Sequence, residues 1–66
     1  MNDKNLNLKE IYALAIKNHQ KGNSQTAEDL YIKILKELPN HINTKSNLGA
    51  LYVQIGKKEK AKSILQ

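Results

Sequence analysis

Few side chains in this 66-residue sequence could carry catalytic or metal-binding chemistry, and those few do not cluster. The two histidines, His19 and His41, lie far apart, and there is no cysteine, which excludes disulfides and thiolate metal sites. Neither histidine has a second nitrogen, sulfur or carboxylate ligand at the spacing of a metal site. We therefore expect no metal and no cofactor.

The carboxylates give no sign of acid–base catalysis. Glu28, Asp29 and Glu37 fall at positions that predict a solvated helix face and not a converging pair. The sequence has no glycine-rich phosphate loop and no serine or cysteine in the context of a nucleophile. We expect that the protein is not an enzyme.

Eleven lysines against six acidic residues give a formal charge of +5, and no arginine is present. A small basic helical nucleic-acid binder is therefore one alternative, with phosphate contacts made by Lys57, Lys58, Lys60 and Lys62. Readers of nucleic acid favour the planar fork of arginine, which argues against this alternative. Scattered lysines are more typical of solvated helix faces.

The length predicts one small unit, near the size at which a single apolar core only just offsets the entropy of folding. No apolar run is long enough to cross a membrane, and the polar N-terminus does not resemble a signal peptide. We expect a cytoplasmic protein that does not enter a membrane.

A repeat organises the chain. A shift of thirty-four residues superposes identical residues, namely Leu14 on Leu48, Gln20 on Gln54, Gly22 on Gly56 and Ala27 on Ala61. Glycine and alanine keep the same separation in both copies. Internal periods of this length are typical of helical-repeat proteins.

Each copy predicts two helices, over 8–21 and 24–38, then over 42–55 and from 58 to the end. Expected N-caps are Asn7 in a capping box with Glu10, then Ser24 and Asn40. Gly22 and Gly56 are expected to end the first and third helices, and Pro39 stops the second. The residues expected to face inward are Leu8, Ile11, Leu14, Ala15, Ala27, Leu30, Tyr31, Ile34, Leu35, Leu38, Leu48, Leu51, Tyr52, Ile55, Ala61, Ile64 and Leu65.

The predicted fold class is all-α, with antiparallel helix-turn-helix repeats, four helices in all and the last one short. No segment shows the alternation of a strand. We divide the chain into a flexible lead at 1–7, a first repeat at 8–41 and an incomplete second repeat at 42–66. Ala15 and Gly49 should face Ala27 and Ala61, because small residues let helix axes approach closely.

At these residues the pattern resembles the tetratricopeptide repeat, with its signature W-x2-L-G-x2-Y, then A-x3-F, then P. Leu48, Gly49 and Tyr52 match the first part, whereas Lys45 replaces the tryptophan. Ala27, Tyr31 and Pro39 match the second part. Further departures are Asn18 for the tyrosine in the first copy and Leu65 for the aromatic residue in the second.

This resemblance implies a protein-interaction module whose concave face binds a peptide or partner helix. Asn47 matches one rung of the asparagine ladder found in O-linked glycosyltransferase repeats, but Ala13 does not. The carboxylate clamp of chaperone-binding repeats is unsupported, because Tyr12 and Ile16 replace its lysine and asparagine. The implied concave residues are Lys9, Tyr12, Ile16, His19, Gln20, Asn43, Ser46, Asn47, Ala50, Val53 and Gln54.

The histidines also have structural interpretations. His19 either contacts the ligand or, as we favour, meets the last carbonyls at its helix C-terminus. His41 is expected to be structural or solvent-facing.

Two further expectations concern the context of the chain. Residues 18–41 are also similar to first repeats ahead of bacterial glycosyltransferase or sulfotransferase domains, which makes an accessory segment of a transferase a third alternative. The C-terminal edge has no polar capping helix, so we expect either a fragment of a longer array or a homodimer through exposed apolar residues there, with a partly molten chain as the third alternative. These edge residues are Tyr52, Ile55, Ile64 and Leu65.

Overall fold

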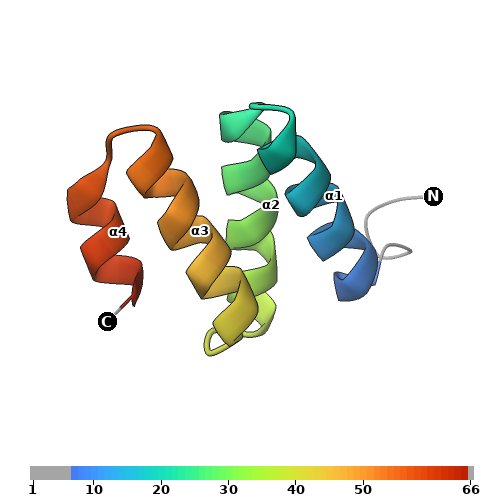
Figure 1. The fold of residues 1–66 in the computed structure, drawn as a ribbon. Coiled ribbons are helices and arrows are strands. Elements are labelled where there is room, and N and C mark those ends of the chain that lie inside the picture. Colours follow the sequence, from blue (N-terminus) through green and yellow to red (C-terminus); the bar gives the residue numbers. More distant parts are fainter. Residues whose placement is uncertain (1–6, 66) are drawn as a thin grey trace.

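The computed structural model describes residues 7–65, apart from the side chain of Leu65. Four helices make up this part of the chain, and it contains no strand: α1 (Leu8–Gln20), α2 (Ser24–Glu37), α3 (Ile42–Gln54) and α4 (Lys58–Leu65). They form two antiparallel hairpins that stand side by side, with α2 packed against both α1 and α3 (Figure 1). The all-α class with four helices and a short last helix is confirmed. The predicted flexible lead lies outside the described residues, except for Asn7.

The helix starts agree only in part with the predicted caps. Asn7 and Glu10 form the expected capping box, in which the Glu10 N–H donates to Asn7 Oδ1 over 2.8 Å. Ser24 is instead the first residue of α2, after Asn23, whose side chain makes no cap hydrogen bond. Asn40 does not cap α3. The N-cap is the next residue, His41, where the backbone is still extended and the ring accepts from the Thr44 N–H.

The two turn glycines end their helices as predicted. Gly22 has φ +83° and Gly56 has φ +80°, a left-handed conformation that suits glycine. The residue after each glycine donates its N–H to a carbonyl five residues back, Asn23 to Asn18 and Lys57 to Tyr52. This is a Schellman motif, and it occurs twice at the period of the repeat.

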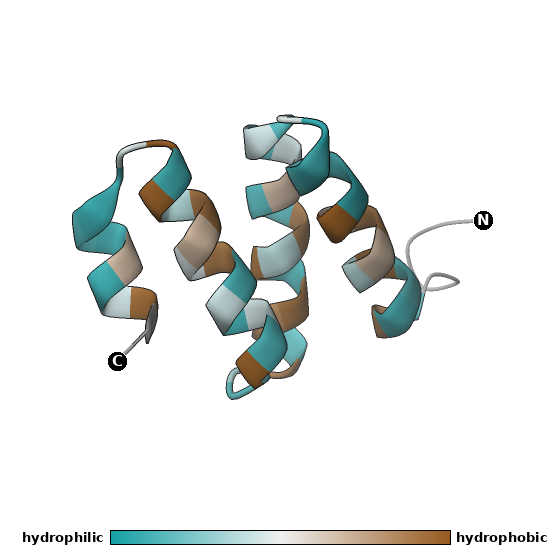
Figure 2. Ribbon diagram, viewed as in Figure 1, coloured by the Kyte–Doolittle hydropathy of each residue, from teal (hydrophilic) through white to brown (hydrophobic). Residues whose placement is uncertain are grey.

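The core lies between the helices and contains the small residues that the repeat predicted. Ala15 and Ala27 are fully buried, and Ala61 is nearly so, in one cluster with larger side chains. The other buried members are Tyr31, Leu48, Leu51 and Tyr52. Apolar and hydrophilic stretches alternate along the four helices, as amphipathic packing requires (Figure 2).

Three residues expected to face inward are exposed. Leu14 is 41% exposed because Ile11 and Ala15, four residues apart, form the seam of α1. Leu38 and Ile55 are 42% and 37% exposed, since each lies one residue past its helix as the C-cap. The third helix therefore ends at Gln54 and not at Ile55.

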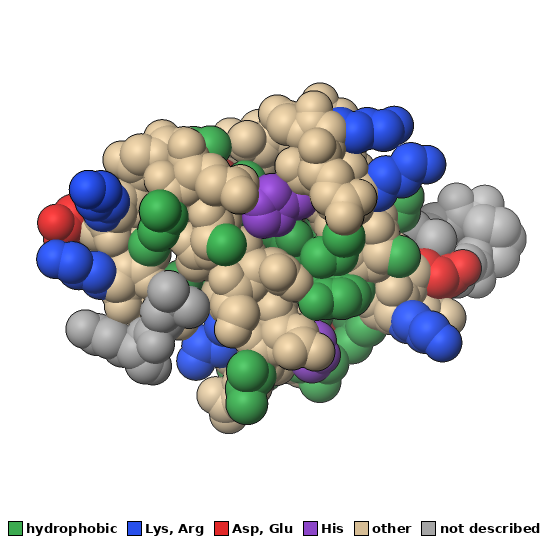
Figure 3. Space-filling view, viewed as in Figure 1, with side chains coloured by type: hydrophobic (Ala, Val, Ile, Leu, Met, Phe, Trp, Pro, Cys, Tyr) green, Lys and Arg blue, Asp and Glu red, His purple; other side chains and the backbone are tan. Residues whose placement is uncertain are grey.

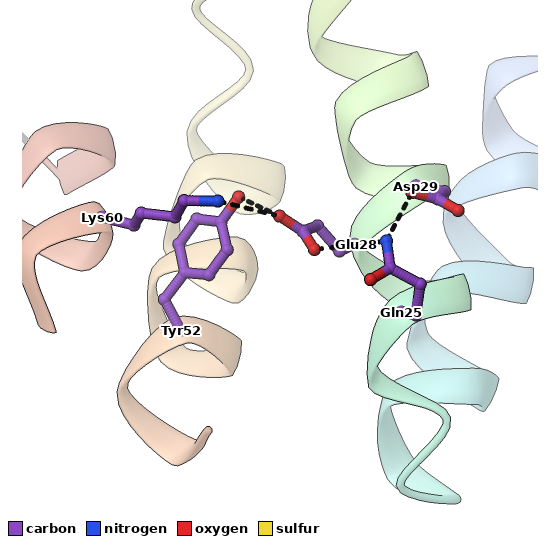
Figure 4. Close-up of polar contacts among 5 residues, drawn as sticks. All are labelled: Gln25, Glu28, Asp29, Tyr52 and Lys60. Carbon is purple, nitrogen blue, oxygen red and sulfur yellow. Dashed lines mark hydrogen bonds and ion pairs between the residues drawn. The ribbon is translucent and has the colours of Figure 1, made fainter. Parts of the chain in front are cut away.

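Glu28 contradicts the prediction of a solvated helix face, because it is only 7% exposed. The Tyr52 hydroxyl donates to Glu28 Oε2 over 2.7 Å, and Lys60 Nζ lies 3.9 Å from the same oxygen (Figure 4). Asp29, beside it on α2, is exposed and accepts from Gln25. The carboxylate of Glu28 thus joins the first hairpin to the second.

Candidate binding groove

Side chains of α1 and α3 meet along one face of the molecule. Asn47 Nδ2 donates to the Tyr12 hydroxyl over 2.7 Å. Seven residues further along each of the two helices, His19 Nε2 lies 2.8 Å from Gln54 Oε1. The rings of Tyr12 and His41 also make an edge contact, with centroids 5.8 Å apart. These contacts fix the spacing of α1 and α3, the two helices that the family resemblance predicts to line a concave face.

Two hollows open on this face. The first, which we call the His19 hollow, has a volume of about 440 Å³ and is lined by Ile16, His19, Gln20, Gly22, Asn47 and Gln54. The second, the His41 hollow, has a volume of about 380 Å³ and is lined by Leu8, Lys9, Tyr12, Ile34, Leu38, His41 and Asn43. We call the two hollows together the binding groove.

The groove brings together eight of the eleven predicted concave residues. Ser46 instead lines a smaller hollow of about 150 Å³ with Ile42, Lys45 and Ile64, at the edge formed by α3 and α4. Ala50 and Val53 are exposed on α3 and line none of these three hollows. The eleven predicted concave residues therefore do not all line the groove.

Sequence analysis missed several residues of the groove. Leu8, Ile34 and Leu38 were assigned to the core, yet their apolar surface also forms part of the His41 hollow. The sequence did contain a sign that Leu38 lies at the surface, because it comes directly before Pro39, where the chain leaves the helix. Tyr31 was likewise treated as core alone, although its hydroxyl holds the His19 ring.

The ring of His19 connects three helices. The sequence favoured a different role, in which His19 meets the last carbonyls of α1. Its Nδ1 lies 2.9 Å from the Tyr31 hydroxyl on α2, and its Nε2 contacts Gln54 on α3. Because Gln54 Oε1 can only accept, Nε2 carries the proton and Tyr31 donates to Nδ1. The ring is thereby held in one orientation at the wall of the His19 hollow.

The lining of the groove is basic or neutral. Among residues 7–65, none of those that line its two hollows is an aspartate or a glutamate. In the space-filling view, one histidine side chain (purple) lies in the middle of this face and the other lower down, with hydrophobic surface (green) between them and most charged side chains toward the left and right ends (Figure 3). Within residues 7–65, no three histidine, cysteine or acidic side chains gather as they would to hold a metal ion.

The predicted self-association edge is smaller than expected. Tyr52 is 6% exposed and bonded to Glu28, so it is not available at an open edge. Ile55 is exposed and Ile64 is partly buried, whereas the side chain of Leu65 lies outside the described part. Homodimer formation through this edge stays a prediction.

Two buried tyrosines should make the fold sensitive to high pH. Burial raises the pKa of Tyr31 to about 12, with a smaller contribution from Tyr12, and burial together with the bonded, charged Glu28 raises that of Tyr52 to about 12. Both values lie above the unfolded value of 10.0. Stability that depends on the neutral phenols is thus complete below about pH 10 and is lost as the pH rises through about 12.

We therefore expect the free energy of unfolding, measured in urea across this interval, to fall with increasing pH. Tyr52→Phe should show a smaller fall than the unmodified chain, because it has one buried phenol fewer. The comparison also cancels the effect of lysine deprotonation, which both proteins share. Equal slopes in the two proteins would contradict the prediction.

Comparisons with known proteins identify no relative of this chain: no family model, no curated protein and no solved structure matches it. Of the part of the chain that the structure describes, no helix is both long and apolar enough to cross a membrane. The class that the structure defines is that of paired helical hairpins with an open groove between their first helices.

Proposed function

We propose that the chain is a tetratricopeptide-type module that binds an extended peptide or helix of a partner protein in the binding groove, without catalysis. The observation that carries this proposal is the pair of hollows on the α1 and α3 face, separated by the Asn47–Tyr12 hydrogen bond. Two successive hollows suit two side chains of one bound segment. The repeated Schellman motif and the thirty-four-residue period support the repeat assignment.

The chemistry of the groove fits a peptide main chain. Gln20 is an exposed amide at the His19 hollow, and Asn43 is another at the His41 hollow. Amide side chains both donate and accept, as a peptide backbone requires. Asn47 is engaged with Tyr12 in this structure, so a bound segment would exchange that hydrogen bond for one of its own.

A selection from a random peptide library, followed by fluorescence anisotropy with the selected peptides, tests the proposal. Tyr12 separates the two hollows, so Tyr12→Ala should weaken binding about tenfold, the effect of a central aromatic contact. The matched control is Ile32→Ala on α2, because Ile32 is 37% exposed and lines none of the three hollows. Thermal melts establish that both variants are folded.

Two results would contradict the proposal. One is a selection that yields no binder, and the other is binding that Tyr12→Ala and Ile32→Ala affect equally. A parallel titration with duplex and single-stranded oligonucleotides at two salt concentrations tests the nucleic-acid alternative. Tight binding that weakens steeply with salt would favour that alternative, because phosphate contacts release counterions.

A further inference from the structure

The first hairpin uses one surface to pack against the second. Three side-chain hydrogen bonds join the two hairpins, and α3 supplies its side of each. Their partners on the first hairpin are Tyr12, His19 and Glu28. Tyr12 and His19 are half-buried and Glu28 is buried. This surface of the first hairpin therefore accepts a single helix.

The second hairpin carries the counterpart of this surface, and there it is open. A shift of thirty-four residues takes the three positions to Ser46, Val53 and Lys62, all of which are exposed. Ala50 is exposed too and shares a face of α3 with Ser46 and Val53, which lie four residues before it and three after it. In Figure 1, α4 stands at the end of the row of helices, beyond α3. We call Ser46, Ala50, Val53 and Lys62 the α3–α4 surface.

Charge distinguishes this surface from its counterpart on the first hairpin. Glu28 accepts a hydrogen bond from α3, whereas Lys62 at the corresponding position can only donate. Lys58, one turn earlier on α4, is also exposed. Helix α4 has three lysines against one acid, Glu59, and lysine side chains (blue) gather at this end of the molecule (Figure 3). A partner with carboxylates would complement it.

A second copy of this chain does not match the α3–α4 surface. Stacked in the order of the repeats, it would present Ala13, Asn18 and Gln20, the counterparts of the three bonding residues of α3. Ala13 has no polar group, and the amide of Asn18 is already bonded to Leu14 and Asn23. Pairing about a two-fold axis would instead oppose the basic surface to itself, which like charges disfavour.

We propose that the α3–α4 surface binds an acidic amphipathic helix of another protein, with small or apolar side chains against Ala50 and Val53 and a carboxylate at Lys62. A helix is the expected occupant because α3 covers the corresponding surface of the first hairpin. Ala50, Val53 and Lys62 line neither hollow of the binding groove. The inference therefore does not rest on the proposed function.

Three synthetic peptides of equal length test the inference. The first has a stripe of alanine and leucine flanked by glutamates, the second has lysine in place of each glutamate, and the third is the acidic peptide with a central proline, which breaks the helix. At low salt the acidic helix should shift the methyl signals of Ala50 and Val53 saturably in nuclear magnetic resonance spectra. Its affinity should exceed that of either other peptide about tenfold.

Two charge-matched variants locate the contact. Lys62→Glu should weaken the acidic helix about fivefold and strengthen binding of the lysine peptide, because it reverses the charge that the partner meets. Lys17→Glu changes the net charge by the same amount at an exposed position of α1 and should have less than about half that effect. Thermal melts check that both variants are folded.

Four results would overturn the inference: no saturable binding, equal binding of the acidic and lysine peptides, equal binding of the acidic helix and its proline form, or equal weakening by Lys62→Glu and Lys17→Glu. Light scattering tests the second copy. A dimer that Val53→Asp dissociates would assign the α3–α4 surface to self-association and also overturn the inference. Binding of the selected peptides in the groove is measured separately through Tyr12→Ala, so either proposal can fail while the other stands.

Discussion

Tyr31→Ala should remove a large part of the free energy of unfolding of the chain. Tyr31 is fully buried on α2 and belongs to the cluster that contacts both hairpins. Truncation of a buried aromatic side chain costs about 3–5 kcal/mol. A chain of this length has a total stability of about 3–10 kcal/mol, at the usual 0.05–0.15 kcal/mol per residue. Far-UV circular dichroism during urea titration measures the loss.

Tyr31→Phe is the matched variant, since it keeps the ring and removes only the hydroxyl. His19 Nδ1 then loses its partner, and we expect a loss of about 1 kcal/mol, the usual contribution of one hydrogen bond. Helical content should be unchanged. A Tyr31→Ala protein that melts like the unmodified chain would show that Tyr31 does not occupy the core.

The repeat explains why the four helices could be predicted from the sequence, and the α1–α3 contacts follow its period. Tyr12 and Asn47 lie thirty-five residues apart, as do His19 and Gln54, which is one residue more than the period. A residue on α1 thus meets the residue after its own counterpart on α3. Both pairs were on the predicted concave face, but the shift alone did not show that their side chains bond to each other.

Other features depend on packing that no local pattern specifies. Glu28 precedes Tyr31 by three residues, so it lies on the buried stripe of α2 by spacing alone. Its charge argued for solvent, but the hydroxyl of Tyr52, twenty-four residues later and in the other hairpin, donates to the carboxylate, with Gln25 and Lys60 also near it, and these contacts make its burial tolerable. In the same way, the N-cap of α3 is His41, whose ring reaches the Thr44 N–H. The general preference for asparagine at N-caps pointed to Asn40 instead.

The Glu28–Tyr52 hydrogen bond should contribute more to stability than any other single polar contact described here. The acceptor is charged and the pair is buried, which makes such a bond worth about 1.5–3 kcal/mol. Glu28→Ala should therefore lower the free energy of unfolding by about 2–3 kcal/mol, since it also leaves the Tyr52 hydroxyl without an acceptor. Lys60 contributes little, because its side chain is 58% exposed and its distance to the carboxylate is long.

A double-mutant cycle separates this bond from the other effects of each substitution. Glu28→Ala and Tyr52→Phe should each destabilise the chain, and the double variant should be more stable than the sum of the two losses predicts, by about 1–2 kcal/mol. Glu28→Gln retains an acceptor for the hydroxyl and should lose only about 1 kcal/mol. Urea titration of the unmodified chain, the two single variants Glu28→Ala and Tyr52→Phe, and the double variant gives the coupling free energy between the two side chains.

Lys60→Ala completes the comparison, because it removes the neighbouring cation and leaves the hydrogen bond in place. Its loss should stay below about 1 kcal/mol. Strict additivity of Glu28→Ala and Tyr52→Phe would mean that the two side chains do not meet. A loss in Lys60→Ala as large as that in Glu28→Ala would assign the stability to the ion pair instead. Glu28, Tyr52 and Lys60 line neither hollow of the groove, so substitutions at this link between the hairpins can test the fold separately from binding.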